Sequence, residues 1–223
     1  MIENYVKIVI FISISIVLIG TTIVPIPDIP GLGDKARIIY LHVPMSWIAV
    51  LAFLISMINS VKYLKRKEII YDIRAYSAAE IGFLFSILAT VTGSLWAKFN
   101  WGSFWNWDPR QTSIFILLLI YGAYFSLRSA IENPEQKAKL SSVYSIIAFV
   151  TVPFFVFIMP RLVASLHPED TIVNSQGKIN MNPVMFSVFM FSLASFSLYF
   201  FWMLNIKVRL EKLKLKYSEL KNN

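Results

Sequence analysis

The chain has 223 residues, of which 57% are hydrophobic and 15% are charged, and its net charge is +8. Soluble domains are roughly 45–50% apolar and about 25% charged, so this composition argues against a soluble domain and also against a disordered chain. The absence of cysteine excludes disulfides, thiolate metal sites and cysteine nucleophiles. In so apolar a chain, the positive charge indicates basic cytoplasmic loops of a membrane protein rather than nucleic-acid binding.

Six apolar segments reach the length of about 20 residues that a spanning helix needs. They cover approximately residues 5–25, 43–61, 77–97, 111–130, 141–160 and 184–205. The first segment is longer than the apolar part of a signal peptide, and no small-residue cleavage site follows it, so we expect a retained helix. The sequence thus predicts an all-α polytopic membrane protein with six transmembrane helices. We expect residues 1–205 to form the membrane domain and residues 206–223 to form a basic amphipathic cytoplasmic tail.

The distribution of Lys and Arg predicts that both termini are cytoplasmic. With the N-terminus inside, 15 of these residues fall on the inner side and 6 on the outer side. The outer loops then cover residues 26–41, 96–110 and 161–183. The only two histidines lie on this outer side, His42 at the start of the second helix and His167 early in the third loop.

Two features of the cytoplasmic side have alternative interpretations. Ser77 and Glu80 have the spacing of a capping box at the start of the third helix, although Glu80 could instead be a functional carboxylate inside the membrane. The tail places apolar residues three or four positions apart among lysines, a pattern typical of a basic amphipathic helix on anionic lipid or against a partner helix. A solvated continuation of the last spanning helix explains the same pattern equally well. The apolar positions are Ile206, Leu210, Leu213, Tyr217 and Leu220.

Residues 96–112, between the third and fourth helices, are the most informative segment. Four of the six tryptophans lie here, namely Trp96, Trp101, Trp105 and Trp107. Tryptophan collects at membrane interfaces, but an interfacial belt is spread over all helix ends. The concentration favours an aromatic surface for a large planar apolar ligand, with a structural belt as the alternative.

Three further residues of this segment are candidates for structural or ligand-binding roles. Gly102 permits a turn or a close approach of a ligand. Asp108, before a proline, is placed to cap the fourth helix. The Arg110 guanidinium could pair with Asp108 or bind a ligand carboxylate.

The two histidines are the only imidazoles available to a metal. An ordinary hydrogen-bonded role is the more usual one for a histidine. Combined with the aromatic surface, however, they suggest two axial ligands for the iron of haem, which is flat. A zinc site is less favoured, because distant carboxylates would have to complete its coordination.

The run WGSFWNWDPRQT, residues 101–112, resembles the tryptophan-rich WWD motif of the haem-handling proteins of cytochrome c biogenesis. This family comprises CcmC, CcmF and the CcsA-type synthases. Six expected helices, the position of the motif between the third and fourth, and the presence of only two histidines make the chain most similar to the CcmC branch. The resemblance covers nearly the whole chain.

The resemblance implies a protein of the bacterial inner membrane that binds haem b non-covalently at its periplasmic face. His42 and His167 would be the axial iron ligands. The surface for haem and a partner would comprise Trp101, Gly102, Trp105, Trp107, Asp108 and Arg110. The implied partners are a CcmE-like periplasmic haem chaperone, CcmA- and CcmB-like ABC transporter subunits and a CcmD-like small helper.

The implied role is haem transfer rather than catalysis. Two alternatives remain at this point. One is a CcsA-like cytochrome c synthase subunit that promotes covalent haem attachment, and the other is a structural or ion-transport subunit whose tryptophans are only anchors.

Overall fold

A computed structural model describes residues 2–26, 32–167 and 181–222, and within these ranges the chain forms helices and loops. Six of the helices are long and apolar enough to cross a membrane, which confirms the expected all-α class. Most of the expected third outer loop, residues 168–180 with Lys178, lies outside the described residues.

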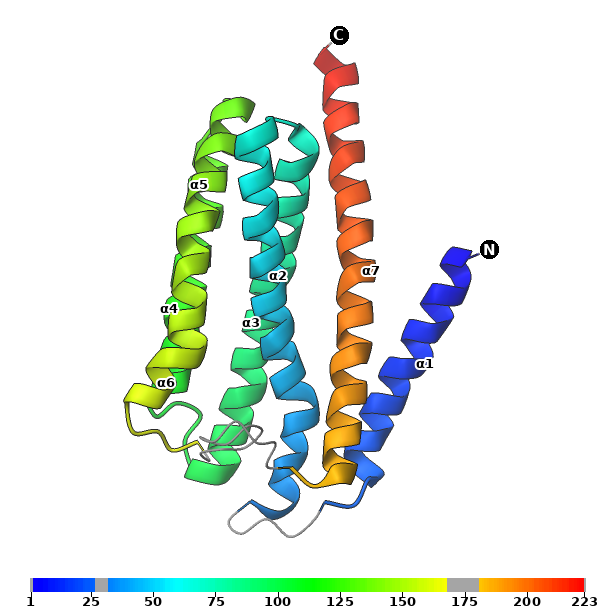
Figure 1. Cartoon of the computed structure of the whole chain (residues 1–223), viewed down its shortest axis with the longest axis vertical. Helices are drawn as coiled ribbons and strands as arrows, with labels where there is room; N and C mark the ends of the chain where they lie inside the picture. The colour runs from blue at the N-terminus through cyan, green and yellow to red at the C-terminus, as the bar shows by residue number, and fades with distance from the viewer. Residues whose placement is uncertain (1, 27–31, 168–180, 223) are drawn as a thin grey trace.

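The spanning helices are α1 (Ile2–Ile23), α2 (Ile39–Arg66), α3 (Ile69–Trp101), α4 (Pro109–Ala130), α5 (Pro134–Pro153) and α7 (Pro183–Asn222). The short 3-10 helix η1 (Gly33–Ile38) leads into α2. The helix α5 continues through a π turn, η2 (Phe154–Ile158), into the four-residue α6 (Met159–Leu162). In Figure 1, α2 to α5 form a bundle, α7 runs along one side of it, and α1 leans outward from the lower part of α7.

Consecutive spanning helices alternate in direction, so both termini point toward the upper end in Figure 1, where α2 turns into α3. The connection between α3 and α4 lies at the lower end, together with η1 and the segment after α6. We call the lower end the loop end and the upper end the terminal end.

The helix ends at the loop end follow from local residue chemistry. Gly102 ends α3 in the left-handed conformation, with φ of 81°, which costs glycine no steric strain. Asp108 caps α4, and Pro109 occupies its first turn, where a missing N–H costs nothing. These two positions limit the loop to Gly102–Asp108, since the first part of the tryptophan-rich segment continues α3 to Trp101.

The expected capping box at Ser77 and Glu80 is wrong, because α3 begins eight residues earlier, at Ile69. Ser77 is buried inside the helix, and its hydroxyl has no hydrogen-bond partner. Glu80 instead forms an ion pair with Lys207 of α7, with 2.6 Å between Oε1 and Nζ. The last spanning segment and the expected tail lie in one helix, α7, which runs from Pro183 to Asn222.

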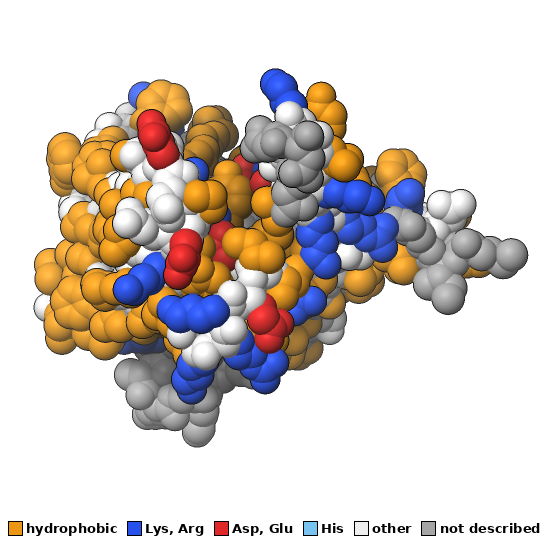
Figure 2. Space-filling model, turned by 90° about the horizontal axis from the view of Figure 1, so that it is seen from above, with side chains coloured by type: hydrophobic (Ala, Val, Ile, Leu, Met, Phe, Trp, Pro, Cys, Tyr) orange, Lys and Arg blue, Asp and Glu red, His pale blue; other side chains and the backbone are white. Residues whose placement is uncertain are grey.

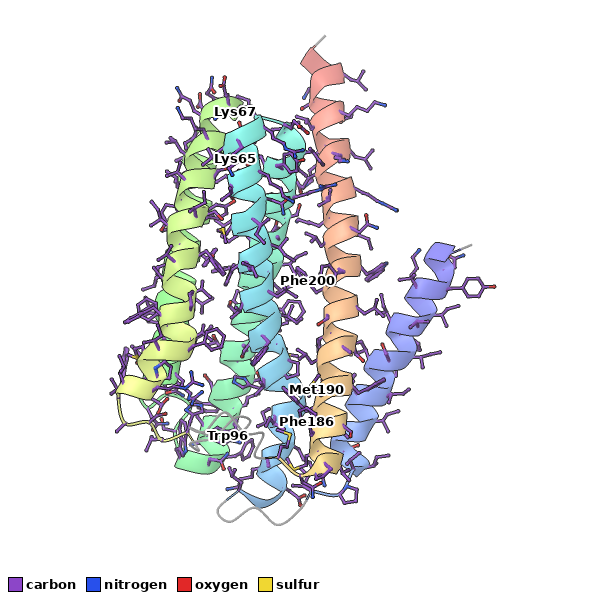
Figure 3. The ribbon with its side chains drawn as sticks, viewed as in Figure 1. Lys65, Lys67, Trp96, Phe186, Met190 and Phe200 are labelled. Carbon is purple, nitrogen blue, oxygen red and sulfur yellow. The ribbon has the colours of Figure 1, made fainter. Side chains whose placement is uncertain are left out.

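An aromatic core fixes the helices between the two ends. Phe53 of α2 and Tyr121 of α4 stack with 3.5 Å between ring centroids, and Phe200 of α7 is fully buried beside α2 (Figure 3). Nearer the terminal end, Asp72 of α3 forms a two-pronged ion pair with Arg128 of α4, with N–O distances of 2.7 and 2.6 Å. This packing holds α2, α3 and α4 in fixed relative positions, and it therefore positions the side chains at the loop end.

Candidate haem-binding site

Asp108 is the polar centre of the loop end. Its buried carboxylate caps α4, because Oδ1 accepts a hydrogen bond from the backbone N of Arg110 at 2.9 Å. Oδ2 accepts two more hydrogen bonds, from Oγ of Ser165 at 2.8 Å and from the backbone N of Leu166 at 2.7 Å. Oδ1 also lies 2.9 Å from Nδ1 of His167. One carboxylate thus joins the α3–α4 loop to the segment after α6.

The electrostatics define the protonation of this pair. Burial alone would raise the pKa of the Asp108 carboxyl, but hydrogen bonds from Arg110, Leu166 and Ser165 outweigh burial and lower that pKa below its ordinary value. Burial lowers the pKa of the His167 imidazole to about 4, against the opposing effect of Asp108. At neutral pH a neutral imidazole therefore donates from Nδ1 to a carboxylate, which leaves the lone pair on Nε2.

Two tryptophans of α3 enclose the His167 ring. The Trp96 ring stacks on it with a centroid distance of 5.5 Å and an interplanar angle of 27°. The Trp101 ring meets it edge-on at 4.8 Å, and the two indoles are 5.1 Å apart. Aromatic contacts on two sides and a carboxylate at Nδ1 fix the orientation of the imidazole.

His42, in the first turns of α2, packs against the same helix α3. Its Nδ1 lies 3.0 Å from Oγ1 of Thr92. Its ring also lies against Gly93, where a Cβ atom would come within 2.8 Å of Cε1 of His42. The absence of a side chain at Gly93 is therefore what allows the imidazole to approach α3.

The last turns of α3 bring the two histidines to one end of the bundle. His42 contacts Thr92 and Gly93 of α3, and His167 contacts Trp96 and Trp101 farther along the same helix. The segment before α2 is fixed to α3 by two hydrogen bonds, from Nζ of Lys35 to the carbonyl of Phe99 at 2.9 Å and from Nε1 of Trp96 to the carbonyl of Lys35 at 3.2 Å. These two bonds fix η1, which leads into α2, to the last turns of α3 at the loop end.

Trp105 and Trp107 form a second aromatic group, apart from the indoles that enclose His167. Their rings meet edge-on at 5.9 Å, and Trp105 also contacts Phe115 of α4. Trp107 is 69% exposed, and Phe104 is 53% exposed. Trp107 and Asp108 also line a pocket of about 270 Å³, shared with the backbone region around Leu166. The loop therefore presents an open aromatic surface.

Two other expected site residues have more limited contacts. Gly102 serves as the turn that ends α3, and a Cβ there would have no neighbour within 4 Å. The expected side-chain pair of Arg110 with Asp108 is replaced by a bond to the Arg110 backbone, and among the described residues the imidazole of His167 donates to the same carboxylate. The Arg110 side chain is exposed, so its charge remains available to an anionic group.

Comparison with known proteins identifies the family. A family model described as Heme exporter protein C matches residues 1–223. The chain belongs to this family. It is 31% identical over 179 residues to Heme exporter protein C of Paracoccus denitrificans, which covers 80% of this chain and 74% of that protein. It is 31% identical over 197 residues to the protein of the same name from Escherichia coli (strain K12), covering 84% and 77%.

A plant relative extends the comparison. The chain is 37% identical over 125 residues to a putative cytochrome c biosynthesis ccmC-like mitochondrial protein of Marchantia polymorpha, covering 56% of this chain and 52% of that protein. Membership of the Heme exporter protein C family confirms the resemblance inferred from the tryptophan-rich motif and the two histidines.

Sequence reasoning overlooked four residues that this member of the exporter family uses to build the loop end. Lys35, Thr92, Gly93 and Ser165 hold the histidines or their neighbours in place. For Thr92 a weak signal was available, because it lies four residues before Trp96 and so one helical turn away on the same face of α3. Lys35 contacts residues that are 61 and 64 positions away in the sequence, and Ser165 contacts a residue that is 57 positions away. No local sequence pattern reveals contacts over such separations.

Proposed function

We propose that this protein holds haem b at the loop end, with His42 and His167 as axial ligands, and transfers it to a periplasmic haem chaperone of the CcmE type. The observation that carries the proposal is the state of the two imidazoles. Each has Nδ1 next to an oxygen atom of the protein, Oγ1 of Thr92 for His42 and Oδ1 of Asp108 for His167. A neutral imidazole with a free Nε2 is a ligand suited to haem iron.

The surrounding side chains match the chemistry of haem as a cargo. The exposed rings of Phe104 and Trp107 offer apolar contact to a planar macrocycle. The exposed Arg110 guanidinium offers a charge to a propionate carboxylate. Haem is too apolar to travel free in water, so a carrier that holds it through exchangeable iron–nitrogen bonds suits a transfer step.

The charge distribution supports a periplasmic loop end. Lys and Arg side chains are spread over the terminal end, which Figure 2 shows from above. Lys65 and Lys67 lie at that end, whereas Trp96 lies at the opposite one (Figure 3). An excess of basic residues is typical of the cytoplasmic side, so we place both termini in the cytoplasm of a bacterial inner-membrane protein.

Family membership favours a transfer role over a cytochrome c synthase, since the matching family is described as an exporter. We accordingly propose a complex with CcmA- and CcmB-like ABC transporter subunits and a CcmD-like helper, and no enzymatic step by this chain itself. The basic extension of α7 is placed to contact anionic lipid or a partner on the cytoplasmic side.

The optical spectrum of the purified protein in nanodiscs tests haem ligation. We expect the bands of low-spin, six-coordinate haem, and we expect His42→Ala and His167→Ala each to lower haem occupancy or convert the haem to a five-coordinate form. Spectra and occupancy unchanged in both variants would reject axial ligation by these residues.

A transfer assay tests the aromatic surface. The double variant Trp105→Ala and Trp107→Ala should insert into membranes normally but should load a purified CcmE-like chaperone more slowly than the wild type. Trp202→Phe, on α7, is the control for loss of an indole elsewhere. Equal loading by the double variant and this control would remove the aromatic surface from the proposal.

Cysteine labelling tests the orientation, because the natural chain contains no cysteine that would give a background. A membrane-impermeant maleimide added to spheroplasts should modify Ser103→Cys, in the α3–α4 loop. It should modify Lys214→Cys, near the end of α7, only after the membrane is opened. The reverse pattern would place the loop end in the cytoplasm.

A further inference from the structure

The hydroxyl of Thr92, on α3, lies beside the imidazole of His42. Its Oγ1 lies 3.0 Å from Nδ1 of His42, on a helix packed directly against α2. The same Oγ1 lies 2.8 Å from the carbonyl oxygen of Leu88, one helical turn earlier, and 3.1 Å from that of Ala89. The Thr92 hydroxyl therefore has two kinds of neighbour, carbonyl oxygens and a ring nitrogen.

The hydrogen-bonding capacity of a hydroxyl decides the direction of these bonds. A threonine hydroxyl has a single hydrogen and two lone pairs, whereas a carbonyl oxygen only accepts. The hydrogen must therefore point at Leu88 or Ala89 for the bond along the helix to exist. Oγ1 is then left as an acceptor, and Nδ1 of His42 is the donor. In a neutral imidazole with Nδ1 protonated, the lone pair lies on Nε2.

We propose that Thr92 is a positioning residue that fixes His42 in the tautomer with Nδ1 protonated and so directs its Nε2 to the iron of bound haem. The inference rests on the proposed function, in which His42 is an axial ligand. In this role Thr92 acts through His42, which its Oγ1 contacts.

The packing of the ring keeps this arrangement in place. Cε1 of His42 lies against the backbone of α3 at Gly93, so the edge of the ring that joins the two nitrogens faces the helix. A rotation of the ring by half a turn would put a carbon atom where Nδ1 lies and would lose the bond to Thr92. At the second histidine, Asp108 performs the same task with a carboxylate at Nδ1 of His167. Both imidazoles thus have an oxygen atom beside Nδ1, which leaves Nε2 as the nitrogen with the lone pair.

Nitrogen NMR of the haem-free protein tests the tautomer directly. The chain has only two histidines, so a protein labelled with ¹⁵N-histidine gives few signals, and His42→Gln assigns them. We expect one protonated and one unprotonated nitrogen in His42, with the proton on Nδ1. The variant Thr92→Val keeps the shape of the side chain but removes the acceptor, and we expect it to give a mixture of tautomers or the opposite one.

Haem titration followed by absorbance provides the second measurement. We expect Thr92→Val to bind haem about 10- to 100-fold more weakly, which is the usual cost of removing the partner of a ligating histidine. Thr92→Ser retains Oγ and should restore both the tautomer and the affinity. Thr90→Val is the matched control, because the Thr90 hydroxyl makes the same helical bond, to the carbonyl of Ser86 at 2.8 Å, without a histidine bond.

The possible failures can be told apart. If Thr92→Val keeps Nδ1 protonated and binds haem as tightly as Thr90→Val, the positioning role is wrong. If His42→Ala leaves the haem spectrum and affinity unchanged, the proposed function fails first, and the role of Thr92 toward haem fails with it.

Discussion

Replacing Asp108 by asparagine should weaken the network that positions His167 although the side chain keeps its shape. The two carboxylate oxygens accept four hydrogen bonds, two at Oδ1 from Arg110 and His167 and two at Oδ2 from Ser165 and Leu166. An amide must turn its NH₂ group toward one of these pairs, whose two bonds then lose their acceptor and whose backbone N–H, of Arg110 or of Leu166, faces another donor. A hydrogen bond to a charged group is worth about 1.5–3 kcal/mol, so two lost bonds remove about 3–6 kcal/mol from the loop end.

Only the part of that energy that positions His167 enters the haem affinity, since the rest lowers the stability of the haem-free protein as well. We therefore expect Asp108→Asn to weaken haem binding by on the order of 100-fold, equivalent to about 2.7 kcal/mol. Ser165→Ala removes one of the four bonds and should have a smaller effect in the same direction. Haem titration followed by absorbance measures both.

The control for helix capping is Asn133→Ala. Asn133 caps α5 by accepting a hydrogen bond from the backbone N of Gln136 at 2.9 Å, and its loss should cost about 1 kcal/mol of stability without changing haem affinity. Wild-type affinity in Asp108→Asn would refute the reasoning, because it would mean that the carboxylate only caps a helix.

Two further substitutions separate effects on the site from effects on the fold. Gly93→Ala places a Cβ 2.8 Å from Cε1 of His42 and should lower haem affinity in the same titration. Gly122→Ala is the control, because a Cβ there has no neighbour within 4 Å, and it should leave the affinity unchanged. Equal affinities of the two variants would show that the His42 ring moves freely. Asp72→Asn leaves the buried Arg128 without its charged partner and should destabilise the protein by about 3–5 kcal/mol. The loss should be measured as a lower Tm in nanodiscs, with the haem spectrum unchanged. An unchanged Tm would mean that the ion pair contributes no stability.

The sequence predicted those parts of the fold that depend on local chemistry. Apolar segments of sufficient length specify six spanning helices, and Asp108 before Pro109 specifies the start of α4. Gly102 was expected to permit a turn, and it ends α3 in the left-handed conformation that glycine adopts without strain. The placement of His42 and His167 at one end follows from the alternation of the helices alone.

The early start of α3 could not be predicted, because its cause lies on another helix. The third apolar segment of the sequence begins at about residue 77, and Asp72 and Arg74 lie before it. In the structure the charge of Asp72 is paired with Arg128 of α4, 56 residues away, so the helix can extend through it. The same holds for Glu80, whose local pattern suggested a cap and whose actual partner, Lys207, is 127 residues away.

The division of the tryptophans was hidden for a related reason. As a segment, residues 96–112 suggested a single aromatic surface. Because α3 continues to Trp101, the first two indoles follow the helix and enclose His167, while Trp105 and Trp107 remain on the exposed loop. The number of aromatic residues was visible in the sequence, but their assignment to two different tasks depends on where the helix ends.

The two histidines differ in the partner of Nδ1, and this difference bears on the proposed transfer of haem. The acceptor for His167 is a charged carboxylate, and the acceptor for His42 is a neutral hydroxyl. A carboxylate makes an imidazole the more electron-rich ligand, so the iron bond to His167 should be the stronger of the two. Ligands of unequal strength suit a cargo that has to leave, because the weaker bond can exchange with a chaperone ligand while the stronger one still holds the iron. On this argument His42 yields first, and Thr92 governs how readily it does so.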